Sequence, residues 1–198
     1  MRDITKFSIV LLIFFAVLIL SAGCSTDNPA SSDEHSSRIT LHHDTENLAA
    51  PTLPADTYEG AARFTAADTG NAANARLVEI HYYIAQLPNV CVVKVYGPNS
   101  ADLPGNLLYS ADVMTSTSAQ GWNIHELQEP IVLTGEDVWL SIEFSHTDQR
   151  AVLGCDPGPA VKDGDWLLTN VDNEWLPLST RTQISINWNV RGIVETQH

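Results

Sequence analysis

The eight residues Asp137–Phe144, DVWLSIEF, decide the fold that this chain is expected to adopt. Every second side chain from Val138 to Phe144 is apolar, and the intervening side chains, beginning with Trp139, point the other way. A period of two places successive side chains on opposite faces of an extended strand. The stretch therefore predicts a β-strand with one buried face, and it leaves Trp139 either exposed or covered by a loop.

Three further stretches have the same two-residue rhythm. They are Leu77–Ile84 (LVEIHYYI), Val90–Tyr96 (VCVVKVY) and Gln183–Val190 (QISINWNV). In the first, the buried face is expected to include Val78. In the last, Ile184 and Trp188 are expected to face the core, with Asn187 and Asn189 facing solvent.

Turn sequences rich in Gly, Pro, Asn and Asp separate these strands, as at Gly97–Ser100 and Asp156–Pro159. From Thr57 onward, no window carries a helical stripe longer than two turns. Many short strands at intervals of roughly 8–12 residues are typical of a β-sandwich or β-barrel. The sequence therefore predicts an all-β domain of antiparallel strands over residues 57–198.

The N-terminus has the features of an export signal. Arg2 and Lys6 flank the start of an apolar block at residues 7–20, which is shorter than the about 20 apolar residues that a membrane-spanning helix needs. A positive start, a short apolar core and small residues at the end are typical of a secretory signal. An ordinary cleaved signal and an uncleaved anchor are the alternatives to the more specific interpretation that the end of this block suggests.

The block ends in LSAGC at residues 20–24, which resembles the lipobox of bacterial lipoprotein signal sequences. The resemblance implies cleavage before Cys24, acylation of that cysteine and durable anchoring to a membrane. By analogy with enterobacterial sorting, Ser25 favours the outer membrane. The protein is therefore expected in the cell envelope, on the extracytoplasmic side of a membrane.

Three segments are expected along the chain. Residues 1–23 form the signal peptide, residues 24–56 the lipidated cysteine and a flexible linker, and residues 57–198 the β domain. The linker is rich in Ser, Thr, Asp and Pro and has no aromatic residue, so it is expected to bury too little surface to order itself. His42, His43 and Asp44 lie in it and are not expected to be preorganised for metal binding.

Several stretches of the predicted domain resemble a known module. They include PIVLTGEDVWLSIEFSHT (130–147), GCDPGPAV (154–161) and NWNVRGIV (187–194). Together they resemble a jelly-roll-like β-sandwich found in secreted surface proteins of Bacteroidetes-type bacteria, near gingipain-type cleaved adhesin domains. The resemblance implies a jelly-roll-like fold from about Ala61 to Val194 and no catalytic residues.

The formal net charge of −14 bears on partners. It has the wrong sign for a phosphate backbone and disfavours nucleic-acid binding. Calcium takes 6–8 oxygen ligands, often from Asp carboxylates in loops. Five acidic residues among glycines are therefore candidates for a structural calcium site, although acidic turns are commonly just solvated. They are Asp156, Asp163, Asp165, Asp172 and Glu174.

With Cys24 assigned to lipid, two cysteines remain. In an oxidising compartment Cys91 and Cys155 are expected to form a disulfide. The alternative is two separate buried thiols that behave as small apolar groups.

Four of the five tryptophans are candidates for a ligand site, and Trp188 is assigned to the core. Exposed aromatic rings beside carboxylates and amides can stack on sugar rings while the polar groups bind hydroxyls. Alternatively, the rings close the ends of the sandwich. The four candidates are Trp122, Trp139, Trp166 and Trp175.

No catalytic constellation is evident. Asp68-Thr69-Gly70 matches the tripeptide of aspartic proteases, but it occurs once and reads as a turn. No GxSxG elbow is present, which leaves a site around His146 and Asp156 as the basis of a rival hydrolase or peptidase function. The sequence therefore predicts a membrane-anchored binding or adhesion module for a glycan or protein surface, with a structural envelope lipoprotein as a further alternative.

Overall fold

The computed structural model describes residues 36–69, 75–99 and 102–197. The expected signal peptide and Cys24, with the LSAGC stretch that resembles a lipobox, lie outside the described residues, as does Gly70 of the Asp-Thr-Gly tripeptide. None of the helices within the described ranges is long and apolar enough to span a membrane.

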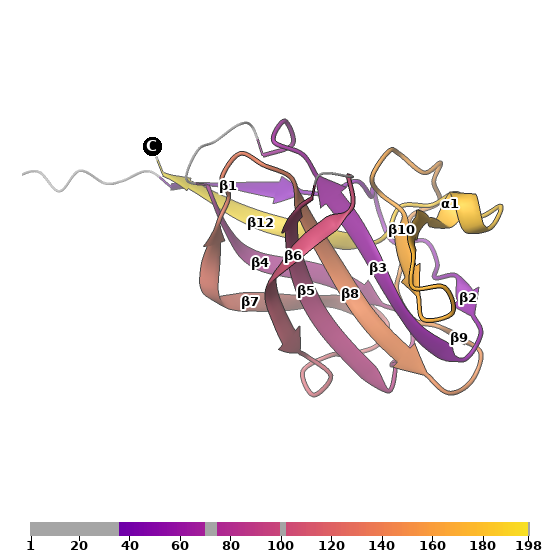
Figure 1. Cartoon of the computed structure of the whole chain (residues 1–198). Helices are drawn as coiled ribbons and strands as arrows, with labels where there is room; N and C mark the ends of the chain where they lie inside the picture. The colour runs from indigo at the N-terminus through magenta and orange to yellow at the C-terminus, as the bar shows by residue number, and fades with distance from the viewer. Residues whose placement is uncertain (1–35, 70–74, 100–101, 198) are drawn as a thin grey trace, which may run out of the picture. The chain divides into compact units, whose positions relative to one another are not determined.

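Two antiparallel sheets make up most of the described chain (Figure 1). The first has the order β1-β12-β4-β7. Its strands are β1 (Ser36–Leu41), β12 (Val190–Gln197), β4 (Arg76–Ile84) and β7 (Gly121–Val132).

The second sheet has the order β11-β10-β3-β8-β5-β6. Its strands are β11 (Trp175–Pro177), β10 (Trp166–Thr169), β3 (Asp56–Phe64), β8 (Val138–His146), β5 (Val90–Pro98) and β6 (Pro104–Asp112). A small ladder joins β2 (Thr52–Leu53) to β9 (Arg150–Ala151), and the short helix α1 (Leu178–Arg181) follows β11.

The strand order is that of a jelly roll. Without the β10–β11 hairpin, the main sheets read β1-β12-β4-β7 and β3-β8-β5-β6. The chain passes repeatedly between the two sheets, so strands adjacent in space are mostly distant in sequence, as in a sandwich built from two Greek keys. The all-β sandwich prediction is confirmed, and the β10–β11 hairpin extends the six-stranded sheet beyond β3.

The stretch DVWLSIEF forms most of β8, at an inner position of its sheet. Val138, Leu140, Ile142 and Phe144 are all buried in one core with residues of the opposite sheet, such as Ile80. Trp188 is also buried there, as predicted. Alternation therefore placed the core face of this strand correctly.

A bulge changes the expected face of β4. The register with β7 shifts between Leu77 and Glu79, so Leu77 is fully buried and Val78 is only partly buried. The extra residue breaks strict alternation at the start of the strand. The sequence pattern holds again from Ile80.

The strand predicted at Gln183–Val190 is wrong. The chain enters β12 only at Val190. Ile186 and Trp188 are buried as expected, but the exposure is reversed at Ile184, which is 40% exposed, and at Asn187, which is 2% exposed. Asn187 Nδ2 donates to Asp156 Oδ2 at 2.9 Å, and its backbone N–H donates to Asp156 Oδ1 at 2.8 Å. The amide side chains face inward because the loop that packs on them supplies their hydrogen-bond partners.

The expected flexible linker is also corrected. From Ser36 onward the chain is part of the sandwich, since β1 pairs along its length with β12 (Figure 1). Asp44 is buried, and its carboxylate accepts hydrogen bonds from Asn189 Nδ2 at 2.7 Å and Arg191 Nε at 2.9 Å. The composition of this segment gave no sign of order because its partners lie about 150 residues away in the sequence.

The predicted disulfide is absent. Cys91 and Cys155 are free, buried thiols. Cys91 faces the core from β5, while Cys155 forms isolated bridges with Ala49 and Trp188. Burial raises the pKa of each thiol to about 11, so the alternative of two small apolar groups describes them.

Candidate functional site

Three of the four candidate tryptophans meet on the outer face of the six-stranded sheet. Trp139 comes from β8, Trp166 from β10 and Trp175 from β11. The ring of Trp139 lies 5.0 Å from that of Trp166 and 6.2 Å from that of Trp175, centroid to centroid. Tyr96 of β5 lies 6.4 Å from Trp175. We call these four residues the aromatic cluster.

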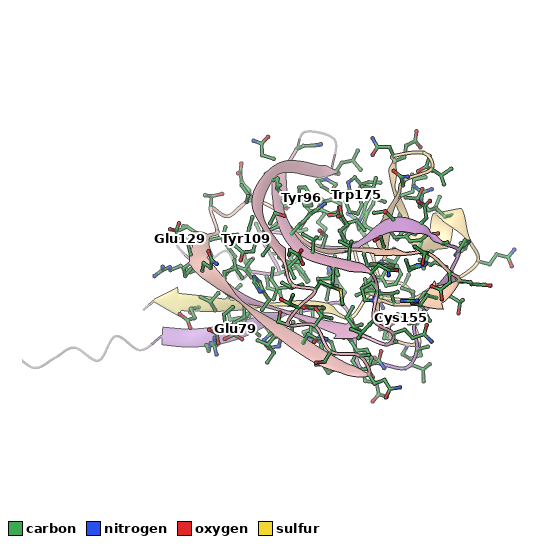
Figure 2. The ribbon with its side chains drawn as sticks, turned by 90° about the horizontal axis from the view of Figure 1, so that it is seen from below. Glu79, Tyr96, Tyr109, Glu129, Cys155 and Trp175 are labelled. Carbon is green, nitrogen blue, oxygen red and sulfur yellow. The ribbon has the colours of Figure 1, made fainter. Side chains whose placement is uncertain are left out.

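The cluster requires the sheet to curl. Three strands separate β11 from β5, and four steps of about 4.8 Å would hold them about 19 Å apart in a flat sheet. The rings of Trp175 and Tyr96 are nevertheless 6.4 Å apart and adjacent in Figure 2. The β10–β11 edge therefore folds back over the outer face. It leaves Trp139 only 1% exposed, so this ring is covered rather than open to solvent.

A buried arginine supports the cluster from one side. The Arg63 guanidinium lies 5.8 Å from the centre of the Trp139 ring. It donates to Asp137 and Asp102, and lies 3.5 Å from Asp163. Burial lowers the pKa of Arg63, but the hydrogen bond to Asp137 and the surrounding carboxylates raise it above its usual value. The arginine is therefore charged and fully engaged.

A lysine lies between two glutamates on the same face. Lys94 Nζ donates to Glu59 Oε2 at 2.8 Å and to Glu143 Oε2 at 2.6 Å. Burial lowers the pKa of Lys94, but these two bonds raise it overall. Burial, with the Glu59 carboxylate nearby, raises the pKa of Tyr96. Both glutamates are thus tied to one cation on the outer face of the sheet.

Two clefts open beside Trp166. The first has a volume of about 520 Å³ and is lined by both partly exposed tryptophans, Trp166 and Trp175, together with Asn173 and Glu174. We call it the aromatic cleft. The second has a volume of about 400 Å³, includes Arg63 in its lining, and shares Trp166 and Pro177 with the first. Trp166 therefore stands between two adjacent hollows.

The aromatic cleft combines apolar platforms with few polar groups. Trp166 and Trp175 offer ring surface, and they are held in place by contacts with the buried Trp139. Asn173 supplies an amide and Glu174 a carboxylate, both exposed. A sugar ring has an apolar face that stacks on such rings and hydroxyls that bond with such polar groups.

Trp122, the fourth candidate, lies elsewhere. It belongs to β7 and is 38% exposed. The Arg191 guanidinium lies 4.2 Å from the centre of its ring, and Tyr83 packs edge-on at 5.9 Å. Trp122 therefore takes part in the outer face of the four-stranded sheet and not in the aromatic cleft.

The five carboxylates considered for calcium do not form one site. Asp156 bonds with Asn187, and Asp165 accepts the Ser179 N–H at 2.9 Å. Asp172 pairs with Arg181, and that hydrogen bond holds the pKa of Asp172 below its usual range. Asp163 lies by Arg63, and Glu174 lines the aromatic cleft.

Across the described ranges, no group of three or more His, Cys, Asp or Glu side chains could hold a metal ion. Calcium binding stays a prediction, tested by a melting scan with EDTA and then with calcium.

The residues considered for catalysis are likewise apart. His146 Nδ1 lies 2.7 Å from the Asp148 carbonyl oxygen, and its ring stacks on Tyr58 at 5.6 Å. Asp156 is engaged with Asn187 and the Gly158 N–H. Within the described part of the chain, no hydrogen bond or ion pair joins His146 to Asp156.

The structure contains two groups of ion-paired side chains that the sequence did not suggest. One is the Glu59–Lys94–Glu143 network, and the other is the ion pair of the buried Asp44 with the partly exposed Arg191. Glu59, which stands beside Gly60 and two alanines, is the signal for the first. The sequence does not mark this stretch as a strand, because glycine and alanine are poor strand formers.

Comparison with known proteins supports the fold. No family model matches the chain, and no curated protein matches it in sequence. Two solved structures are similar to it, each with a TM-score of 0.59. One is a clostridial cysteine protease, Cwp84, after propeptide cleavage, with 13% identity over 82% of this chain and 40% of that one.

The other structure contains the cysteine protease and lectin-like domains of Cwp84, a surface-layer-associated protein of Clostridium difficile. Its identity is 14%, over 81% of this chain and 36% of that one. This chain thus corresponds to less than half the length of either structure. At such low identity the likeness is one of fold.

Proposed function

We propose that this chain is a non-catalytic, extracytoplasmic glycan-binding module that a lipid on Cys24 anchors to the cell envelope. The aromatic cleft carries the proposal. Two tryptophans, Trp166 and Trp175, stand at its walls, and Asn173 and Glu174 add polar groups at its rim. Its volume of about 520 Å³ lies within the range of small-ligand pockets, about 300–1,000 Å³.

The burial of Trp139 supports a prepared site. Its ring contacts both wall tryptophans, and Arg63 lies over it. Side chains that are fixed before binding lose less conformational entropy when a ligand arrives. The wall tryptophans are therefore suited to stack on a ring without first being ordered.

The fold comparison supports the class of function. One of the similar chains contains a lectin-like domain and belongs to a surface-layer-associated protein. The surface-layer association of that protein and the lipobox-like sequence of this chain both support a module that works outside the cytoplasm.

A glycan array with the full chain, purified in detergent, tests the proposal. Trp175→Ala is expected to weaken binding by about tenfold or more, since it removes one stacking wall. Trp122→Ala is the matched control, because it removes a partly exposed tryptophan outside the cleft. Equal binding by the two variants, or no binding to any glycan by the wild type, would exclude the aromatic cleft as a glycan site.

A second candidate function is an accessory role beside a peptidase. It is favoured by the likeness to a chain that combines a cysteine protease with a lectin-like domain. A pulldown with the immobilised chain tests this role. If a peptidase is recovered both by the wild type and by the Trp175→Ala variant, the chain binds a protein through a surface other than the aromatic cleft. Failure of both ligand tests would leave a structural role in the envelope.

A further inference from the structure

We infer that the aromatic cleft selects a glycan whose sugars carry protonated amino groups. The inference rests on the proposed glycan-binding function and deepens it by naming the ligand class. It depends on the charges around the two tryptophans and on the way in which the nearby cations are already engaged.

The aromatic cleft itself has a negative rim. Its lining residues include the carboxylate of Glu174 and no basic side chain. Glu174 is exposed, and its backbone carbonyl oxygen accepts a hydrogen bond from Arg181, which fixes the chain at that position. The carboxylate thus stands at the edge of the cleft, where a positive group on a bound sugar could reach it.

The adjoining cleft has the same sign. Asp102, Asp163 and Asp165 line it, against Arg63 and Lys162. Arg63 lies within ion-pairing distance of Asp102, Asp137 and Asp163, so its charge is not available to an anionic ligand. Three carboxylates against two cations leave the lining of this cleft negative overall, so a glycan that runs from one cleft to the other across Trp166 meets more negative than positive groups.

The aromatic walls act in the same direction. The face of a tryptophan ring attracts a cation, and this attraction adds to stacking when an amine lies over the ring. An acidic sugar would face both the carboxylates and the negative ring faces, on a chain whose formal net charge is −14. The site thus favours amino sugars over neutral sugars, and neutral sugars over uronic or sulfated ones.

The test compares two probes that share one sugar backbone and differ in whether their amino groups are free or acetylated. They are an oligosaccharide of β-1,4-linked glucosamine and the same oligosaccharide after N-acetylation, titrated into the full chain in detergent with tryptophan fluorescence as the readout. The free amine form is expected to bind about tenfold more tightly at about pH 5.5, where the sugar amines are protonated. This advantage should shrink at 1 M salt, where the Debye length falls to about 3 Å, and disappear above the pKa of the sugar amine.

A pair of charge-neutralising variants locates the effect. Glu174→Gln is expected to reduce the preference for the amine form by about threefold. Glu129→Gln removes the same charge from an exposed position on β7, outside both clefts, and should leave the preference unchanged.

The outcomes separate the amino-sugar inference from the proposed glycan-binding function on which it rests. Equal or tighter binding of the acetylated probe, or equal effects of the two Gln variants, would overturn the amino-sugar inference. If the array then shows a neutral or acidic glycan whose binding needs Trp175, the proposed function stands without it. If no glycan of any charge binds, the proposed function itself fails.

Discussion

Asn187 illustrates how one buried side chain can organise a loop. Its Nδ2 donates to Asp156 and to the Pro159 carbonyl oxygen, and its Oδ1 accepts the Val161 N–H at 2.8 Å. The residue therefore connects the loop after β9 to the segment that leads into β12. Without it, a buried carboxylate and a backbone N–H would both lose a partner.

We predict that Asn187→Ala lowers the free energy of unfolding by about 3 kcal/mol, because two buried polar groups are left partly unsatisfied. Urea denaturation followed by tryptophan fluorescence measures the change. Asn170→Ala, at an exposed position in the β10–β11 hairpin, should change it by less than about 0.5 kcal/mol. If Asn187→Ala leaves the free energy of unfolding unchanged, Asn187 is a surface residue, as the alternating pattern suggested.

Because the pKa values of the two buried thiols are raised, we predict that the protein loses stability at alkaline pH. Their pKa is about 11 in the folded protein, against 9.0 for an unperturbed thiol. Between these values the unfolded chain has released protons that the folded chain retains. Their contribution to stability is therefore complete below pH 9 and is lost as the pH rises toward 11, by about 1.4 kcal/mol per pH unit for each thiol.

Denaturation curves at pH 8 and pH 10, with reductant present, measure this loss. The double variant Cys91→Ala, Cys155→Ala should lose about 2 kcal/mol less than the wild type over the same interval. Equal losses would show that other groups, and not the thiols, cause the alkaline sensitivity.

Residue identity alone could not have separated buried from exposed polar groups. Asn187 and Asn170 are the same residue type, and each has polar residues nearby in the sequence. What buries Asn187 is a partner, Asp156, that lies 31 positions away. Trp139 is a similar case, since its outward direction follows from alternation but its cover comes from β10 and β11.

At the scale of elements, prediction succeeded where a strand has one continuous apolar face. β5 and β8 carry such a face along their length and β4 carries it from Ile80 onward, and the predicted bounds of all three are close to those observed. β3 was missed because Gly60 and two alanines pack against large neighbours in place of carrying their own apolar bulk: a Cβ at Gly60 would lie 2.5 Å from Leu153. β6 was missed because it begins at Pro104-Gly105, a sequence typical of a turn.

β1 gives the sharpest test at this scale. We predict that a chain beginning at Thr57, the expected domain boundary, is destabilised by at least about 3 kcal/mol or fails to fold, whereas a chain beginning at Ser36 folds. The shorter chain exposes the edge of β12 and leaves the partly exposed Arg191 without Asp44. It also removes the buried side chain of Leu41, and the loss of such a side chain costs about 2–5 kcal/mol. Thermal melts of both chains measure this. Equal melting temperatures would show that residues 36–56 do not stabilise the domain and act as a linker.

At the scale of the whole molecule, the sequence could name the parts of the candidate site but not assemble them. Trp139, Trp166 and Trp175 were singled out by their neighbours in the sequence, as was Trp122. Only the curl of the six-stranded sheet decides that the first three meet and the fourth does not. That curl depends on an edge hairpin inserted between β8 and β12, and no local pattern specifies where such a hairpin packs.

The anchor is the last property of the whole molecule that experiment must decide. We predict that cells producing the chain incorporate labelled palmitate into it and that Cys24→Ser abolishes the label, since acylation requires that thiol. Cys155→Ser is the matched control, because its thiol is buried and protonated at neutral pH. Labelling that persists in Cys24→Ser would contradict lipidation at this site. Loss of the label together with release from the membrane fraction would support anchoring of the chain to a membrane through Cys24.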